Sequence, residues 1–293
     1  MASLTSLWPS CSGERRGRRQ ISLITFYRHE AGLPFLEKSV PRQSLLTANI
    51  KKNEIGRIIE AENLHWRLDR EPRQYHSLTR GWVANEVFRR VHPDKITIGE
   101  FIRREISSKL KVDIYLGLQE EELERVSDVK MSSWVRPLVT DLLPRRLGRG
   151  DDLHLVSLVR VVWREVRRSR TGSRPAPAIE GQGPADPLVF NCPEVRRGEV
   201  PSAGVHGTGR GLARLASLMS RGGRDQGVEL LSHTAWAGLH SDPVVGDMTF
   251  HTNTFTRGGL ADFRPNPGDG TIDKVSRQCW REESLMFFLT DIL

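Results

Sequence analysis

Pro93 divides a stretch of helical apolar spacing into two parts. Proline has no backbone N–H and disfavours the helical conformation in the residue before it, so a helix that starts near Gly81 has to end before Pro93. The apolar residues of this first helix recur at helical intervals and predict one buried stripe: Trp82, Val83, Val87, Phe88 and Val91. With a second helix close behind, the segment predicts a helical lobe.

Thr97 and Glu100 have the spacing of a capping box at the start of the second helix. In such a box the threonine hydroxyl accepts a hydrogen bond from the backbone amide of the glutamate, and the carboxylate accepts one from the amide of the threonine. The apolar residues that follow are expected to form the buried face of this helix: Ile98, Phe101, Ile102, Ile106 and Leu110.

Further segments have helical or loop signals. Residues 47–68 carry apolar side chains at helical spacing, and residues 209–219 do so ahead of the glycine pair 222–223, which is expected to stop the helix. Residues 153–166 fit a basic amphipathic helix. Residues 172–186 are rich in proline, glycine and alanine, and they predict a surface loop.

Strand signals are scarce by comparison. The apolar run near Ile21 and the segment Asp113–Leu118 are the two best, and both are short. A five-stranded sheet cannot be assembled from them. The sequence therefore predicts a protein whose helices are better represented than its strands.

The chain of 293 residues is basic, with a formal net charge of +8. Such a balance suits nucleic-acid or anionic-membrane partners. The arginine runs at 15–19, 145–149 and 164–170 are not interleaved with the aromatic side chains that stack on bases, so a solvated surface is favoured and no specific nucleic acid is expected. No stretch approaches the roughly 20 apolar residues that span a bilayer, so no transmembrane segment is expected.

Cys11, Cys192 and Cys279 lie far apart and lack the spacing of metal ligands. We interpret them as free thiols in a reducing compartment, and no metal or organic cofactor is expected. The first 21 residues contain no apolar core of a secretory signal. An intracellular location is therefore favoured over secretion, and a mitochondrial presequence is left open.

Five short motifs follow one another along the chain: 29–34 (HEAGLP), 75–82 (YHSLTRGW), 98–118, 193–204 and 207–218. In this order they resemble the serine β-lactamase-like superfamily, which includes class C β-lactamases, DD-peptidases, family VIII carboxylesterases and animal β-lactamase-like proteins. The likeness is greatest to the animal β-lactamase-like and bacterial esterase-like branches. It covers residues 21–263 as a partial domain, whereas 1–20 and 264–293 are unmatched.

The resemblance implies a β-lactamase/transpeptidase-like fold (α+β, of the α/β type), whose central sheet is built from strands at both ends of the domain. Since strand signals are few here, we expect an incomplete, doubly truncated version in which the helical lobe is best represented and the central sheet is largely missing. The implied chemistry is acyl transfer, in which a serine attacks an ester, amide or lactam carbonyl and water releases the acid. A Ser-x-x-Lys spacing places the activating lysine one helical turn away.

By this resemblance Tyr75 is the candidate proton shuttle, the phenol that passes a proton to the leaving group. Ser77 stands where the family motif has an asparagine and still offers a hydroxyl to a substrate. His76 and His206 are further candidates for the substrate pocket. Each has a plainer interpretation: Tyr75 as a core aromatic at a helix start, His76 as a satisfied neutral side chain, and His206 as a histidine in a loop.

No nucleophile is identified. The Ser-x-x-Lys spacings are Ser108/Lys111 and Ser127/Lys130, and both follow Tyr75, whereas the family nucleophile comes well before it. Both serines are therefore interpreted as surface residues.

The chain is predicted to be a β-lactamase-related serine hydrolase that is inactive by itself, with small-molecule or peptide acyl compounds as the substrates of an active form. The alternative is a non-catalytic interaction or scaffold protein with the same fold. The oligomeric state is left open.

Overall fold

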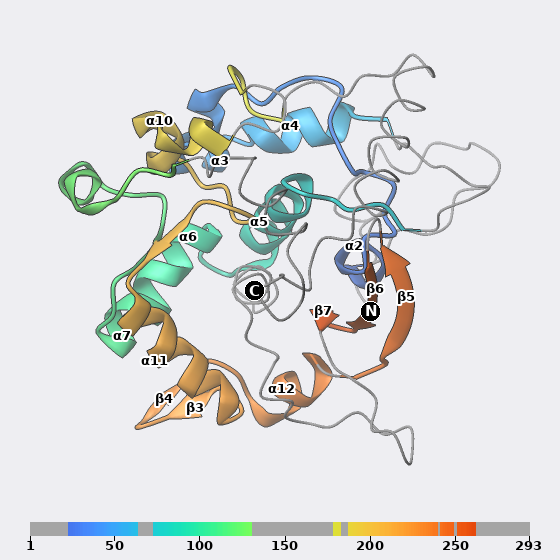
Figure 1. The fold of residues 1–293 in the computed structure, drawn as a ribbon, viewed down its shortest axis with the longest axis vertical. Helices are drawn as coiled ribbons and strands as arrows, with labels where there is room; N and C mark the ends of the chain where they lie inside the picture. Colours follow the sequence, from blue (N-terminus) through green and yellow to red (C-terminus); the bar gives the residue numbers. More distant parts are fainter. Residues whose placement is uncertain are drawn as a thin grey trace, which may run out of the picture.

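The computed structural model describes residues 23–63, 73–130, 178–182, 187–239, 241–248 and 251–261. The expected helix 153–166 and the unmatched segments 1–20 and 264–293 lie outside these residues. In the described part, helices surround one central helix, and the strands belong to three separate small sheets (Figure 1). None of the described helices is long and apolar enough to cross a membrane.

Helix α5 (Thr79–Val91) occupies the middle of the fold, with α4, α6 and α2 placed around it (Figure 1). As predicted, it ends before Pro93, because the C-cap residue His92 is already extended. The expectation of a single buried stripe was wrong, since residues 79–88 are all buried. Neighbouring elements cover residues 79–88 on every side, so the polar side chains there need protein partners in place of water. Val91, which was expected in the buried stripe, is 56% exposed.

Glu86 illustrates how α5 accommodates buried charge. Its side chain is 1% exposed, and its carboxylate binds Arg89 at 2.6 Å and Arg90 at 3.4 Å on the same helix. Both arginines also donate to the side-chain oxygen of Asn53, at 3.0 and 2.7 Å. The charge of Glu86 is thus compensated by the two arginines within the lobe.

The second predicted helix is present but irregular. It runs through α6 (Ile98–Phe101), a π-helical stretch (Ile102–Ser107) and α7 (Ser108–Leu110). The capping box is confirmed, with Glu100 N–H donating to the Thr97 hydroxyl at 3.2 Å and Thr97 N–H donating to the Glu100 carboxylate at 2.8 Å. The expected buried face is confirmed except for Phe101, which is half-buried.

The predicted helix 47–68 was wrong as a continuous element. The structure divides it into α3 (Thr47–Lys51) and α4 (Glu54–Ala61). Asn53 between them adopts a left-handed conformation with φ 66°, which asparagine tolerates better than most residues and which no helix can continue through. The break brings the Asn53 side chain to the two arginines of α5.

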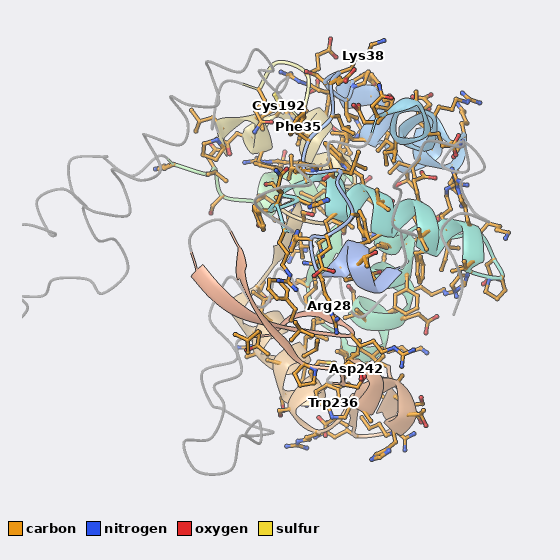
Figure 2. The ribbon with its side chains drawn as sticks, turned by 90° about the vertical axis from the view of Figure 1, so that its right-hand side faces the viewer. Arg28, Phe35, Lys38, Cys192, Trp236 and Asp242 are labelled. Atoms are coloured by element: carbon orange, nitrogen blue, oxygen red, sulfur yellow. The ribbon has the colours of Figure 1, made fainter. Side chains whose placement is uncertain are left out.

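The strand predicted near Ile21 was also wrong, because the described residues there form helix α2 (Leu23–Tyr27). Phe26 is 2% exposed and packs in the core. Helix α2 adjoins strand β7 (Gly259–Ala261), and the link to the sheet is made by a side chain: Arg28 donates to the carbonyls of Thr256 at 3.2 Å and Asp242 at 2.5 Å. Figure 2 shows Arg28 beside Asp242.

The remaining helical elements connect these parts. Helix α11 (Gly209–Ser220) begins at Thr208, whose hydroxyl accepts from Gly211 N–H, and it ends as predicted at the glycine pair 222–223, where φ is +77° and +80°. The other elements are α10 (Pro193–Arg197), α12 (His233–Leu239) and the 3-10 helices Arg42–Leu45, Glu120–Arg125 and Pro187–Asn191.

The sheets are small and antiparallel. The strand predicted at Asp113–Leu118 is confirmed by β1, and the expected weakness of the sheet is confirmed among the described residues. The pairings are β1 (Ile114–Leu116) with β2 (Val205–Gly207), β3 (Arg224–Asp225) with β4 (Val228–Glu229), and β5 (Val244–Met248) with β6 (His251–Thr256) and then β7.

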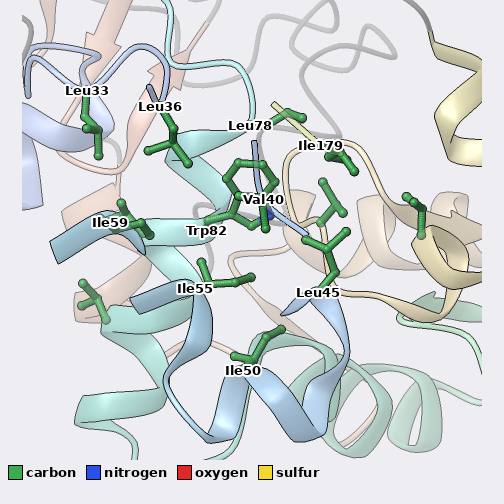
Figure 3. Close-up of a cluster of buried hydrophobic side chains, with 14 of the residues drawn as sticks. Leu33, Leu36, Val40, Leu45, Ile50, Ile55, Ile59, Leu78, Trp82 and Ile179 are labelled. Carbon is green, nitrogen blue, oxygen red and sulfur yellow. The ribbon is translucent and has the colours of Figure 1, made fainter. Parts of the chain in front are cut away.

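Two apolar clusters lie on different parts of α5. Trp82 is at the centre of the first, among Val40, Leu78 and Ile55 (Figure 3). Phe88 belongs to the second, with the buried side chains of α6, α7 and α11. Within the predicted surface loop 172–186, the described residues 178–182 are anchored, because Ile179 is 0% exposed in the first cluster and forms a parallel bridge with Val40.

Replacing Gly81 by alanine is expected to lower the melting temperature, against the usual preference of helices for alanine. A Cβ at Gly81 would lie 2.6 Å from the backbone nitrogen of Ser202. Overpacking of this kind costs about 1–3 kcal/mol, whereas alanine in an open helix gains about 1 kcal/mol. Thermal unfolding measures the difference. Gly209→Ala is the matched control, because a Cβ there meets nothing within 4 Å. Equal responses of the two variants would contradict the close approach at Ser202.

Candidate functional site

The loop of residues 73–78, which leads into α5, carries the candidate proton shuttle. Tyr75 in this loop is 39% exposed, so it is not the core aromatic of the plainer interpretation. Its ring lies against that of His29, with 5.1 Å between ring centroids. Ser77, two residues on, is exposed as well. Both hydroxyl-bearing side chains are therefore placed where a soluble molecule can meet them.

His76 is buried beneath this surface and is 1% exposed. Its Nε2 accepts a hydrogen bond from Leu33 N–H at 2.9 Å, which places the ring proton on Nδ1, opposite the Gln74 carbonyl at 2.5 Å. Its role as a pocket residue stays a prediction, and its ring nitrogens contact the backbone of Leu33 and of Gln74.

His29 completes the arrangement, and sequence reasoning did not select it as a site residue. It is 0% exposed, and its Nδ1 accepts from His76 N–H at 2.9 Å. Gln74 N–H donates in turn to the His29 carbonyl at 3.1 Å. The signal in the sequence was its place in the 29–34 motif, which indicated a family likeness without indicating a partner.

Both histidines are neutral at physiological pH. Burial, together with the positive charge of Arg80, lowers the pKa of His29 well below its ordinary value. Burial lowers the pKa of His76 to about 4, against the opposing hydrogen bond to the Gln74 carbonyl. Neutral rings retain the unprotonated nitrogen that each needs as an acceptor.

Arg80 is the charged residue of the site and was also missed. It is 1% exposed, and its guanidinium lies 5.5 Å from the centre of the Tyr27 ring. Burial lowers its pKa to about 10, and the phenols of Tyr27 and Tyr75 act in the opposite direction, so the group is cationic at neutral pH. The spacing held a signal: Arg80 precedes Val83 and Val87 by three and seven residues and interrupts the apolar stripe with a charge.

Additional bonds hold the segment 29–34 and the Tyr75 loop together. The Thr79 hydroxyl donates to the Leu33 carbonyl at 2.6 Å, and Arg73 binds the Glu30 carboxylate at 2.5 Å. The Arg73 guanidinium also covers the ring of Phe255 at 4.7 Å. The Tyr75 loop is thus tied to the first segment and faces the sheet β5–β7.

His206 lies in another environment. It is half-buried in β2, directly opposite Tyr115 of β1. Burial lowers its pKa, and the charges that act on it are those of Arg196 and Glu122. His206 thus has Tyr115, Arg196 and Glu122 as neighbours, whereas Tyr75 lies against His29.

Neither Ser-x-x-Lys spacing forms the side-by-side pair that the chemistry requires. Ser108 is exposed on α7, but the helix ends at Leu110, and Lys111 turns away with φ 53°. Ser127 and Lys130 are exposed in a segment without helical structure. Helix α7 also lies across α5 from α2 (Figure 1), so Ser108 is remote from the neighbourhood of His29 and Tyr75.

The arrangement around Tyr75 can hold and transfer a proton. It combines a partly exposed tyrosine, a neutral imidazole against its ring and a buried cation close enough to act on its charge. Among the described residues, no three histidine, cysteine, aspartate or glutamate side chains gather in a way that would hold a metal ion.

Comparisons with known proteins identify the fold of the chain. No protein-family model and no curated protein matches the sequence. Among solved structures, the chain is similar to a penicillin-binding protein homolog from Caulobacter crescentus, with a TM-score of 0.59 and 20% identity over 91% of this chain and 60% of that one. It is also similar to EstA from Arthrobacter nitroguajacolicus Rue61a, with a TM-score of 0.58 and 20% identity over 87% of this chain and 60% of EstA.

The described part therefore has the predicted α+β, β-lactamase/transpeptidase-like fold in an incomplete form. The chain spans 60% of the length of each of these structures, and its helical lobe is its best-developed part.

Proposed function

We propose that this chain, built on the β-lactamase/transpeptidase-like fold, is a β-lactamase-related protein of the serine acyl-hydrolase type. Tyr75 is its proton-shuttle residue, and the chain does not hydrolyse acyl substrates by itself. The observation that carries the proposal is the exposed residue Tyr75 on a loop fastened to the protein by two buried neutral histidines. The animal β-lactamase-like branch is the proposed affiliation, on the order of the five motifs.

The roles follow from the contacts. Tyr75, which is 39% exposed, exchanges protons with a bound acyl compound, and the nearby Arg80 cation favours negative charge on the phenol oxygen. Ser77 is exposed on the same loop and offers a hydroxyl to the compound. His76 acts beneath them by holding the loop, and His206 takes no part.

The expected absence of turnover follows from the lack of an activated serine nucleophile. Serine is a poor nucleophile unless a base lies against it. The Ser108 and Ser127 pairs lack helical stacking with their lysines, so neither serine is activated in this way.

A fluorophosphonate probe tests the absence of a nucleophile. On protein whose circular dichroism shows it folded, we expect no serine adduct after peptide mapping. We also expect ester and β-lactam hydrolysis equal to that of a Ser108→Ala/Ser127→Ala double variant. An adduct on Ser108 or Ser127, lost in that double variant, would overturn this part of the proposal.

Binding tests the site itself. An acylated dipeptide or a penicillin is expected to bind saturably, and Tyr75→Phe or Ser77→Ala is expected to weaken binding about 2–10-fold, the effect of one hydrogen bond of about 0.5–1.5 kcal/mol. Isothermal titration measures this change. His206→Ala is the matched control and is expected to leave binding unchanged. Equal effects of all three substitutions, or the absence of any binding, would refute the assignment.

A non-catalytic interaction protein is the second candidate. The observation that favours it is strand β5, which has an edge without a paired strand among the described residues and carries Val245 at 64% exposure. Stable oligomers that Val245→Lys disperses, together with the absence of acyl binding, would favour this candidate over the first.

A further inference from the structure

We propose that His29 and His76 are positioning residues for Tyr75 and that they form a proton-sensitive latch. Neutral, the pair fastens the Tyr75 loop to the segment 29–34; protonated, it releases the loop. The inference rests on the proposed role of Tyr75 and adds regulation of that same site by acid.

The latch is reciprocal. His29, on the first segment, accepts from the backbone N–H of His76 on the second at 2.9 Å. His76, on the second segment, accepts from the backbone N–H of Leu33 on the first at 2.9 Å. The two rings are 5.5 Å apart, and the Tyr75 ring lies against His29 at 5.1 Å. Each segment thus supplies one imidazole acceptor and one amide donor to the other.

Protonation reverses the sense of both contacts. An imidazolium has two N–H donors and no acceptor, so each ring would direct an N–H at a backbone N–H. Two buried amides would lose their acceptors at the same time. The bond from Thr79 to Leu33 remains and confines the change to the residues before α5.

The charges around the pair also oppose protonation. Helix α5 contributes Arg80, and the Tyr75 loop contributes Arg73 and the phenol of Tyr75. Helix α2 contributes Tyr27, which faces Arg80, and the segment 29–34 contributes Glu30, whose carboxylate is bound to Arg73. A positive charge at His29 would therefore be repelled by Arg80 and Arg73, and one at His76 by Arg80.

The direction of the pH dependence follows from these shifts. Both histidines have a lower pKa in the closed loop than in the open loop, where the ordinary value is 6.5. The closed loop is therefore fully favoured above pH 6.5 and loses that advantage as the pH falls toward about 4, the pKa of His76.

Fluorine NMR on protein containing 3-fluorotyrosine tests the latch, because the chain has 3 tyrosines. Tyr75 reports on the loop, Tyr27 on the Arg80 neighbourhood and Tyr115 on strand β1 elsewhere in the fold. Assignment uses one Tyr→Phe variant for each. Between pH 7.5 and 4.5 we expect the Tyr75 resonance to move toward the position of unstructured tyrosine while that of Tyr115 stays in place.

Matched amide variants keep a hydrogen-bond acceptor at each histidine position but remove the titration of the ring. His29→Asn places an oxygen near the position of Nδ1, and His76→Gln places one near that of Nε2, but neither amide titrates. The double variant is expected to keep the wild-type Tyr75 position at pH 7.5 and to lose its acid response. His29→Leu/His76→Leu is expected to show the released position at every pH, with hydrogen-exchange protection of the Leu33 amide reduced at least tenfold.

Two outcomes would overturn the latch. Joint movement of Tyr75 and Tyr115 would show global unfolding, and an acid response that survives in the amide variant would show that other groups titrate. Acyl binding is measured separately from these signals. An intact latch without acyl binding would refute the proposed function alone, whereas acyl binding with an acid-insensitive Tyr75 would refute the latch alone.

Discussion

Replacing Trp82 by alanine is expected to lower the free energy of unfolding by about 3–5 kcal/mol, the range for loss of a buried tryptophan side chain. Trp82 is 0% exposed at the centre of the first apolar cluster (Figure 3). It sits on the central helix, so the surrounding residues cannot collapse into the space without moving α5. Since domains are stable by only about 5–15 kcal/mol, we expect a large shift of the urea midpoint.

Trp82→Phe is the matched control. The indole N–H has no acceptor among the described residues, so phenylalanine removes volume without breaking a hydrogen bond seen there. Its cost is expected to be less than half of that of alanine. Equal costs for the two variants would show that a polar contact of the indole, and not its volume, stabilises the lobe.

Replacing Glu199 by alanine is also expected to lower the free energy of unfolding by about 3–5 kcal/mol. The carboxylate is 0% exposed and receives four donors: the hydroxyls of Thr47 and Thr97 at 2.7 and 2.6 Å, the Asn85 amide at 2.9 Å and Gly99 N–H at 3.1 Å. They come from α3, α5 and the start of α6. Each buried donor left without an acceptor costs about 1–3 kcal/mol, and water admitted to the space restores a part.

Glu199→Gln isolates the geometry of this network. Its oxygen can serve Asn85 and Gly99 while its NH₂ donates to the two hydroxyls, so the loss is expected to stay below about 1 kcal/mol. A loss as large as that of alanine, measured by chemical unfolding at pH 7, would show that the negative charge itself is required.

The pH dependence of Glu199 runs opposite to that of the histidines. Burial raises the pKa of this carboxyl above 4.5, against the effect of its donors. Its contribution to stability is therefore fully present below pH 4.5 and declines as the pH rises through the raised value. The difference in stability between wild type and Glu199→Gln is expected to shrink with rising pH.

Signals that act within a few residues were predicted well from the sequence. Pro93 ended α5, Thr97 and Glu100 formed the capping box, and the glycine pair 222–223 stopped α11. Each effect depends on backbone sterics or on hydrogen bonds within one helical turn, so the residues concerned carry the information by themselves.

Signals that depend on distant partners were misread. The segment 47–68 has a continuous apolar pattern, yet it is broken at Asn53, which is left-handed and whose side chain accepts from the two arginines of α5. The apolar run near Ile21 was expected to pair as a strand, yet helix α2 buries Phe26 and reaches the sheet through Arg28. Apolar spacing shows which side chains are buried but not what the backbone is paired with.

The same difference between local signals and distant contacts applies to the candidate site. The sequence by itself determined where the main helices begin and end, and its motif order singled out Tyr75 and the loop around it. Only the tertiary structure decided that His29 and Arg80 belong to the same site, and that His76 supports the loop from beneath. The bond between His76 N–H and His29 spans 47 positions in the chain, and the low pKa values of both rings arise from burial. Burial and contacts of that range exist only once the helices have packed.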